Sequence, residues 1–294
     1  MGSDPVISLA AVTDEFSPTD LEAALGAMAD LGMTSAELRV VSGRNIIDLS
    51  DAEIDDVRAR AEAHGITVLG IASPLLKCVL PDAPPVDPRI QQDSFASSHT
   101  FADQPRLTRR AFAIAERTGA RLIRVFSYWR TVNPDACFDR VAASLGALAE
   151  AALERGVIIG LENEHACNIA TGAETARLLA AVDHPALKMI WDPGNAMVAG
   201  EIPYPDGYRR LPPSRIVHVH VKDGDVITGY TPQWGPLGEM SIDWKGQIAA
   251  LVRDGYHGAL SLETHWTGPG GDKLKGSIIC GQTLKSLVLE ATKN

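Results

Sequence analysis

Four side chains that can bind a metal ion or carry a proton stand at or near the ends of successive apolar runs. Glu162 ends VIIGLE, Asp192 ends LKMIWD, His220 lies in RIVHVHVKD, and Glu263 lies in ALSLETHW. Three carboxylates placed around one imidazole would repel one another without a cation between them. Oxygen-rich ligand sets with one nitrogen are typical of Mn²⁺, Mg²⁺ or Co²⁺, and less typical of structural zinc. We therefore predict one divalent ion, Mn²⁺ first, with Mg²⁺, Co²⁺ or Zn²⁺ as alternatives. The competing interpretation is that each acid only caps a helix or pairs with an arginine.

Side chains alternate along an extended strand, and this alternation decides whether these groups can share one space. If His220 faces inward, His218 and Lys222 face the same way and the intervening valines face out. Glu162 and Glu263 give the same pattern, with small or polar residues on their own side and apolar residues on the other. The sequence therefore predicts one shared inner surface, on which His218 is expected to be a hydrogen-bonded core residue rather than a ligand.

Continuous apolar runs alternate with helix-like segments along the whole chain, and we count eight of each. Continuous runs suit parallel strands that are covered on both faces, and eight strand–helix units in 294 residues predict a (β/α)₈ TIM barrel. The fold class is thus α/β, with a single domain over residues 1–294. A doubly wound open sheet is the rival, but TDEFSPTD follows the first run, Val6–Val12, where such a fold carries a glycine-rich nucleotide loop.

Two long connections between these elements are candidates for substrate selection. The segment Pro74–Pro105 after the third run is the longest irregular stretch, and its length predicts an active-site lid or a mobile loop. A disordered excursion without function is the alternative. The segment Gly224–Ser241 is expected to be a glycine-rich loop.

Composition limits the classes of partner. The chain is 45% hydrophobic and has a net charge of −10, which disfavours binding to a phosphate backbone. No apolar run approaches the roughly 18 residues that span a bilayer, and we find no targeting segment. The four cysteines are scattered without a CxxC pair, so free thiols and a cytoplasmic location are expected.

Several motifs resemble those of a known superfamily. GLENEH, IWDPGN, VHVHVKDG and LSLETHW, in this order and at these intervals, resemble the xylose-isomerase-like TIM-barrel superfamily of sugar isomerases and epimerases, which includes endonuclease-IV-like enzymes. The resemblance implies that Glu162, Asp192, His220 and Glu263 are the metal ligands. It also implies that Glu162 and Glu263 act as an acid/base pair on opposite faces of a bound sugar.

The sequence departs from the trinuclear endonucleases of this superfamily. The third run ends IASPLLK and the fourth ends RVFSYW, without the extra histidines, and Asn195 stands where those enzymes carry another histidine. One metal ion is therefore expected rather than three, and DNA repair becomes a weak alternative. Arg124, in the fourth run, is expected to be a buried partner for a carboxylate.

Further residues near the expected strand ends are candidates for substrate binding. Each has a structural alternative: Lys222 could pair with Asp223 or Asp225, Glu37 with Arg39, and any aromatic side chain could simply pack. The candidates are Lys222, Asn195, Glu164, His165, Arg39, Glu37, Lys77, Trp129 and Trp266.

The expected activity is that of a metal-dependent sugar isomerase or epimerase, which transfers a proton next to a carbonyl through an enediolate. A metal-dependent dehydratase or lyase of a keto-polyol, of the inosose or dehydroshikimate type, is the alternative within enzymes. A non-catalytic sugar-binding or partner subunit is the alternative from another class. The partner is a small sugar or keto-sugar of unspecified identity. The sequence leaves the oligomeric state open, a homo-oligomer included.

Overall fold

A computed structural model describes residues 7–93 and 98–293 of the chain. Eight parallel strands close into a barrel in the order β1-β12-β9-β8-β7-β6-β5-β2. The strands are β1 Ser8–Val12, β2 Ser35–Leu38, β5 Thr67–Leu75, β6 Leu122–Val125, β7 Ile158–Glu162, β8 Leu187–Trp191, β9 Ile216–Val221 and β12 Ala259–Leu262. The predicted single-domain (β/α)₈ barrel is confirmed. Val6, the predicted first residue of the first strand, and residues 94–97 of the long connection lie outside the described residues.

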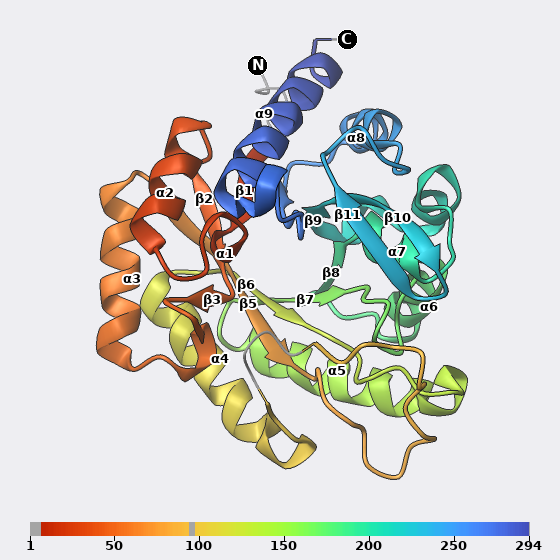
Figure 1. Cartoon of the computed structure of the whole chain (residues 1–294). Helices are drawn as coiled ribbons and strands as arrows, with labels where there is room; N and C mark the ends of the chain where they lie inside the picture. Colours follow the sequence, from red (N-terminus) through yellow and green to blue (C-terminus); the bar gives the residue numbers. More distant parts are fainter. Residues whose placement is uncertain (1–6, 94–97, 294) are drawn as a thin grey trace.

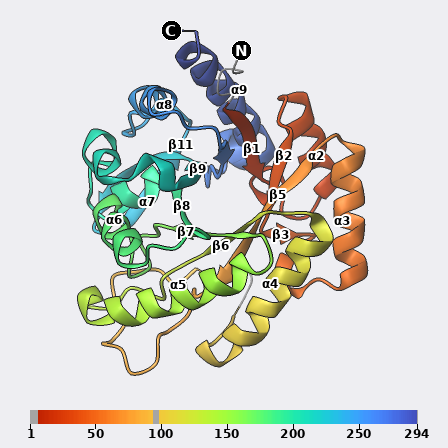
Figure 2. The ribbon, with the colours of Figure 1, turned by 180° about the vertical axis from the view of Figure 1, so that it is seen from behind.

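Within the described ranges, each barrel strand is followed by a helix that packs outside the barrel. They are α2 Leu21–Asp30, α3 Asp51–Ala63, α4 Gln104–Thr118, α5 Phe138–Leu153, α6 Gly172–Ala181, α7 Pro193–Val198, α8 Trp244–Arg253 and α9 Lys273–Ala291. Figures 1 and 2 show these helices around the outside of the strands, with α2, α3, α4 and α5 forming one side. None of the described helices is both long and apolar enough to cross a bilayer.

Local sequence explains where α3 begins and which face it buries. Ser50 caps the helix, because its side chain accepts from the Glu53 backbone and the Glu53 side chain accepts from the Ser50 backbone. Ile54, Val57 and Ala61 then fall on one face and are buried. The spacing of these three apolar residues therefore decides which face of α3 is buried.

The barrel interior is filled by side chains, and Gly160 on β7 shows how tightly. A Cβ atom at Gly160 would lie 2.8 Å from Ile190 Cγ1 and 2.8 Å from Leu122 Cδ1. A side chain at this position, below Glu162, would have to displace the side chains of Ile190 and Leu122. Glu162 itself lies one pleat further on, with the same inward orientation.

Three short additions lie at the carboxyl ends of the strands, and the first differs from the sequence expectation. The segment expected to be a glycine-rich loop contains an antiparallel hairpin, β10 Asp223–Thr228 and β11 Thr231–Gly235, seen in front of α7 in Figure 1. A small hairpin, β3 Val40–Val41 with β4 Arg44–Asn45, follows β2. A short helix, α1 Thr13–Phe16, directly follows β1. These additions place polar residues over the same end of the barrel.

The long connection after β5 reaches the β10–β11 hairpin. The guanidinium of Arg89 lies over the ring of Tyr230, with 4.9 Å between Cζ and the ring centroid. Residue 86 also forms an isolated bridge with residue 131, which follows β6. The described part of this connection therefore lies against both the barrel rim and the hairpin.

Candidate metal centre

The four predicted ligands come together at the carboxyl ends of β7, β8, β9 and β12. Glu162, Asp192, His220 and Glu263 each offer one ligand atom, and these atoms lie within 4.8 Å of one another. His220 Nδ1 is 3.3 Å from Glu162 Oε1, 3.5 Å from Glu263 Oε2 and 3.8 Å from Asp192 Oδ2. All four residues are at most 1% exposed. The predicted convergence of the four side chains is confirmed.

The donor atoms of this cluster fit one divalent ion. Glu162 Oε2, Asp192 Oδ2 and His220 Nδ1 are buried and have no hydrogen-bond partner within residues 7–93 and 98–293, although Glu162 Oε2 and Asp192 Oδ2 each form an ion pair. A buried polar atom left unsatisfied costs about 1–3 kcal/mol. Carboxylate oxygens with one imidazole nitrogen are ligands that Mn²⁺, Mg²⁺, Co²⁺ and Zn²⁺ accept. A cation at this point would satisfy all of these atoms at once.

Two buried cations share the charge of these acids. Lys222 Nζ lies 2.6 Å from Asp192 Oδ2 and 2.9 Å from Glu263 Oε2. Lys222 faces inward, as predicted, and pairs with acids that follow neighbouring strands rather than with Asp223 or Asp225, the structural alternative.

Arg124 Nη1 lies 3.2 Å from Glu162 Oε2 and 3.5 Å from Glu263 Oε1. Its predicted place as a buried partner of a carboxylate is confirmed.

Arg39 donates a hydrogen bond to Glu263 and also contacts two acids of α1. Its Nη1 donates to Glu263 Oε1 at 2.7 Å, and its Nη2 donates to Asp14 Oδ2 at 2.7 Å and to Glu15. Asp14 and Glu15 come from α1, the short helix after β1. The sequence left open whether Arg39 pairs with Glu37, and the structure gives Arg39 these three acids instead.

Glu37 lies behind His220, on the side away from the three acids. Its two oxygens are 3.2 and 3.3 Å from His220 Nε2, and Oε1 is 2.8 Å from His218 Nε2. His218 is buried and hydrogen-bonded, as predicted.

The cluster perturbs the proton affinities of its members. Burial lowers the pKa of His220, but Glu37, Glu263 and Glu162 raise it more, so the pKa lies well above its ordinary value. Burial raises the pKa of Asp192 to about 6, with Lys222 acting against it and Glu162 and Glu263 adding to it. Burial also opposes ionisation of Glu263, but Lys222 and His220 outweigh it and hold its pKa well below the usual range. The acids around His220 thus favour positive charge at the centre of the cluster.

A cavity of about 340 Å³ is lined by residues that contact the cluster, although none of the four ligands lines it. Asn195 joins the two, because its Nδ2 donates to Glu162 Oε1 at 3.0 Å and its Oδ1 lies 3.1 Å from His165 Nδ1. Residues from the long connection, the β7 and β8 ends, the hairpin and the β12 end line the cavity. They are Lys77, Arg89, Gln91, Asp93, Glu164, His165, Ala166, Asn195, Tyr230, Thr231, Pro232, Trp234 and His265. A larger cavity, lined by the ends of α4 and α5, contains none of the predicted site residues.

The structure brings some of the substrate-binding candidates to this cavity and places others elsewhere. Lys77, Glu164, His165 and Asn195 line it, whereas Lys222, Arg39 and Glu37 lie buried around the metal ligands. Trp129 lines a neighbouring cavity of about 610 Å³, which also includes Lys77. Trp266 packs against the apolar core and against Gly276 of α9.

His265 is a cavity residue that the sequence reasoning missed. It lies two positions beyond Glu263, and its Nε2 is 3.7 Å from Glu263 Oε2, while its Nδ1 is 3.3 Å from Glu15 Oε1. The alternation that placed Glu263 inward would have placed His265 inward as well. Arg89 and Tyr230 carried no such signal, because they lie in irregular or hairpin segments.

Residues 25–280 match the model described as xylose isomerase-like TIM barrel. The protein belongs to this family. The predicted superfamily is therefore confirmed, and the fold agrees with it.

One curated relative and two solved structures illustrate the range of this family. The chain is 29% identical over 163 residues to a 3-dehydroshikimate dehydratase of Pseudomonas putida, a match that covers 52% of this chain and only 25% of that protein. A structure described as the IOLI protein with a binding zinc atom is 15% identical, with a TM-score of 0.73, and covers 97% of this chain and 99% of its own. An L-ribulose 3-epimerase is 17% identical, with a TM-score of 0.71, over 98% and 96% of the two chains. At these identities the two structures share the fold with this chain.

Proposed function

We propose that the protein is a divalent-metal-dependent sugar isomerase or epimerase that moves a proton on the carbon next to a carbonyl, through an enediolate. The observation that supports this proposal is the meeting of three carboxylates and one imidazole, which Asn195 and His265 connect to a neighbouring cavity. Two of the carboxylates belong to glutamates, Glu162 and Glu263, on strands separated by β8 and β9. They are the proposed acid/base pair.

The bound ion would be held by Glu162, Asp192, His220 and Glu263, and we propose Mn²⁺, with Mg²⁺, Co²⁺ or Zn²⁺ as alternatives. When bound, it would polarise a carbonyl and its neighbouring hydroxyl and so make the C–H between them more acidic. Glu162 and Glu263 would remove and return the proton. The IOLI protein, which shares the fold, is described with a binding zinc atom, and this supports a divalent ion here.

The surrounding residues would hold the two glutamates in place for proton transfer. Asn195 donates to Glu162, and Arg39 donates to Glu263. Glu162 is thus restrained by a residue that lines the cavity, and Glu263 by a buried residue that does not line it. A pocket of about 340 Å³ lies at the small end of the range for small-molecule sites, which suits a single sugar or keto-polyol.

Solvent exchange tests this proposal directly. The purified protein would be incubated with a panel of keto-sugars in D₂O, with Mn²⁺ or with a chelator, and the recovered sugars analysed by NMR and mass spectrometry. Metal-dependent incorporation of deuterium next to the carbonyl is expected. Full exchange in the presence of the chelator, or no exchange with any substrate and metal, would contradict the proposal.

A dehydratase acting on a keto-polyol is the second candidate, and the sequence match to a 3-dehydroshikimate dehydratase favours it. The same acid/base pair would remove the same proton, but the intermediate would then expel a β-hydroxyl as water. Inososes and dehydroshikimate added to the same panel separate the two reactions. Loss of one water from the substrate, without return of labelled substrate, would identify the dehydratase.

A further inference from the structure

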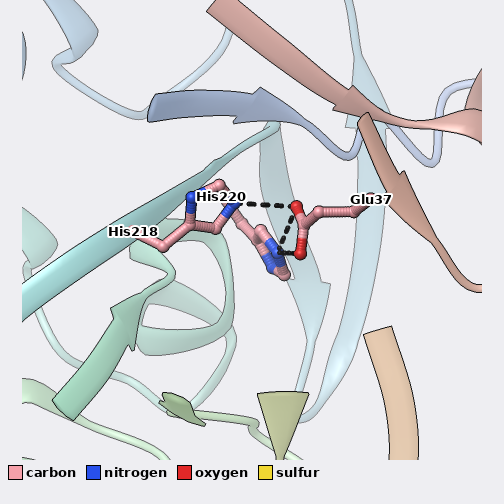
Figure 3. A group of neighbouring side chains, drawn as sticks. All are labelled: Glu37, His218 and His220. Carbon is pink, nitrogen blue, oxygen red and sulfur yellow. Dashed lines mark hydrogen bonds and ion pairs between the residues drawn. The ribbon is translucent and has the colours of Figure 1, made fainter. Parts of the chain in front are cut away.

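Behind the proposed metal ligands, a second group of polar side chains fills the barrel interior. Figure 3 shows Glu37 reaching from β2 toward His218 and His220, which both project from β9. In the barrel, β1 and β12 separate these two strands, so the contact crosses the interior rather than linking neighbours. Ser261 on β12 completes the group, because its Oγ donates to Glu37 Oε1 at 2.6 Å. All four residues are at most 1% exposed.

The contacts of Glu37 fix where the histidine protons lie. An ionised carboxylate can only accept hydrogen bonds. Its oxygens lie 2.8 Å from His218 Nε2 and 3.2 and 3.3 Å from His220 Nε2. Each imidazole must therefore carry a proton on Nε2, the nitrogen that faces Glu37.

The other nitrogen of His220 has the opposite environment. Nδ1 is buried, faces Glu162, Asp192 and Glu263, and has no hydrogen-bond partner in the described part of the chain. A neutral imidazole with its proton on Nε2 presents a lone pair at Nδ1. One side of the ring is thus a donor to Glu37, and the other side points toward the space that a cation would fill.

We propose that Glu37 is a positioning residue for the metal centre. It holds the Nε2–H tautomer and the ring orientation of His220, so that Nδ1 is the atom that binds the ion. A carboxylate that accepts the second N–H of a metal-bound histidine also makes the ligating nitrogen more basic. This inference rests on the proposed function, because it requires that His220 binds a divalent ion.

His218 and Ser261 act on Glu37 and not on the ion. They donate to Glu37 Oε1, and neither residue belongs to the four-ligand cluster. Glu37, His218 and His220 are themselves close enough to hold a cation, but their facing atoms already satisfy one another. The orphaned atom is Nδ1 of His220, so the geometry favours one ion on the Nδ1 side.

The test compares metal affinity in Glu37→Gln and in a matched control, Ser261→Ala, which removes one donor to Glu37 and leaves its contact with His220. The Kd for Mn²⁺ would be measured on the full chain by competition with a chelator, and circular dichroism and urea denaturation in EDTA would confirm folding. Glu37→Gln is expected to weaken Mn²⁺ binding by roughly 10- to 100-fold, the usual loss when a group that hydrogen-bonds a metal-bound histidine is replaced. Ser261→Ala is expected to lose much less.

A spectroscopic measurement on the unmodified protein keeps the proposal testable even if Glu37→Gln does not fold. In ¹H–¹⁵N correlation spectra of the Zn²⁺-loaded protein, His220 is expected to carry its proton on Nε2 and to bind the ion through Nδ1. A proton on Nδ1, or an ion on Nε2, would overturn the proposal. So would two ions per chain of which one depends on His218.

The outcomes separate this inference from the proposed function. Unchanged affinity in a folded Glu37→Gln, with one ion still bound to the unmodified protein, overturns the role of Glu37 alone. Failure of the unmodified protein to bind any divalent ion overturns both.

Discussion

Replacing Lys222 with methionine should reveal how the site balances its charge. The Lys222 ammonium lies 2.6 Å from Asp192 Oδ2 and 2.9 Å from Glu263 Oε2, and all three side chains are at most 2% exposed. Removing one partner of a buried ion pair leaves an uncompensated charge and costs about 3–5 kcal/mol. Methionine keeps the length of the chain that packs against Gly194, so the loss reports mainly the charge. At about 2 °C for each kcal/mol, the metal-free protein should lose roughly 6–10 °C in Tm.

A bound ion should change this result, because it would bring positive charge to the same two carboxylates. An ion present at 100 times its Kd stabilises the native state by about 2.7 kcal/mol. Lys222 competes with the ion for Asp192 and Glu263. The stabilisation by a given Mn²⁺ concentration should therefore be larger in Lys222→Met than in the unmodified protein.

Thermal denaturation and urea denaturation followed by circular dichroism, in EDTA and in Mn²⁺, measure the loss in Tm and the change in unfolding free energy. Lys245→Met is the matched control, because Lys245 forms a 3.5 Å ion pair with Glu290 on the surface, and its side chain is 80% exposed. The control should be nearly neutral in both conditions. The reasoning fails if Lys222→Met is equally destabilising with and without Mn²⁺, since Lys222 and the ion would then not share the two acids.

Three further results are expected. Glu263→Gln should lower deuterium exchange into substrate by at least about 100-fold while circular dichroism stays unchanged, and retained exchange would remove Glu263 as a base. Ellman's reagent should find no reactive thiol in the native protein and four after unfolding, because all four cysteines are free and buried. Burial and the nearby Asp103 also raise the pKa of Cys78 to about 12. Fewer than four thiols after unfolding would indicate a disulfide. Burial lowers the pKa of His165, but the Glu164 carboxylate raises it more, so the folded-state pKa lies above the ordinary value of 6.5. The His165–Glu164 pair should therefore contribute its full stabilisation below pH 6.5 and lose it as pH rises through the folded-state pKa. The difference in unfolding free energy between the unmodified protein and His165→Gln would measure it, and a difference that grows with pH would contradict the assignment.

The orientation of the site residues could be predicted from the sequence because it depends on local alternation. In VHVHVKD the valines pack outward and His218, His220 and Lys222 point inward, as the period of two requires. The partners of Lys222 could not be predicted in the same way. They come from Asp192 and Glu263 on other strands, and their distances to Lys222 depend on barrel closure and stagger.

The contacts of Glu37 depend even more strongly on the closure of the barrel. The sequence places Glu37 and Arg39 on one side of β2, but it does not say that β1 and β12 bring β9 within reach of Glu37. The hairpin after β9 was missed for a different reason. Its β-branched residues Val226, Ile227 and Thr228 lie between glycines and aspartates, whose turn preference dominated the interpretation of that segment as a loop.

The most direct test of the account is the number of divalent ions that the protein binds, measured by equilibrium dialysis with Mn²⁺ and elemental analysis, for the unmodified chain and for His220→Ala. The account predicts one ion per chain in the unmodified protein and loss of that ion in a folded His220→Ala. An unmodified protein that binds no ion, or a His220→Ala variant that binds it equally well, would contradict the account.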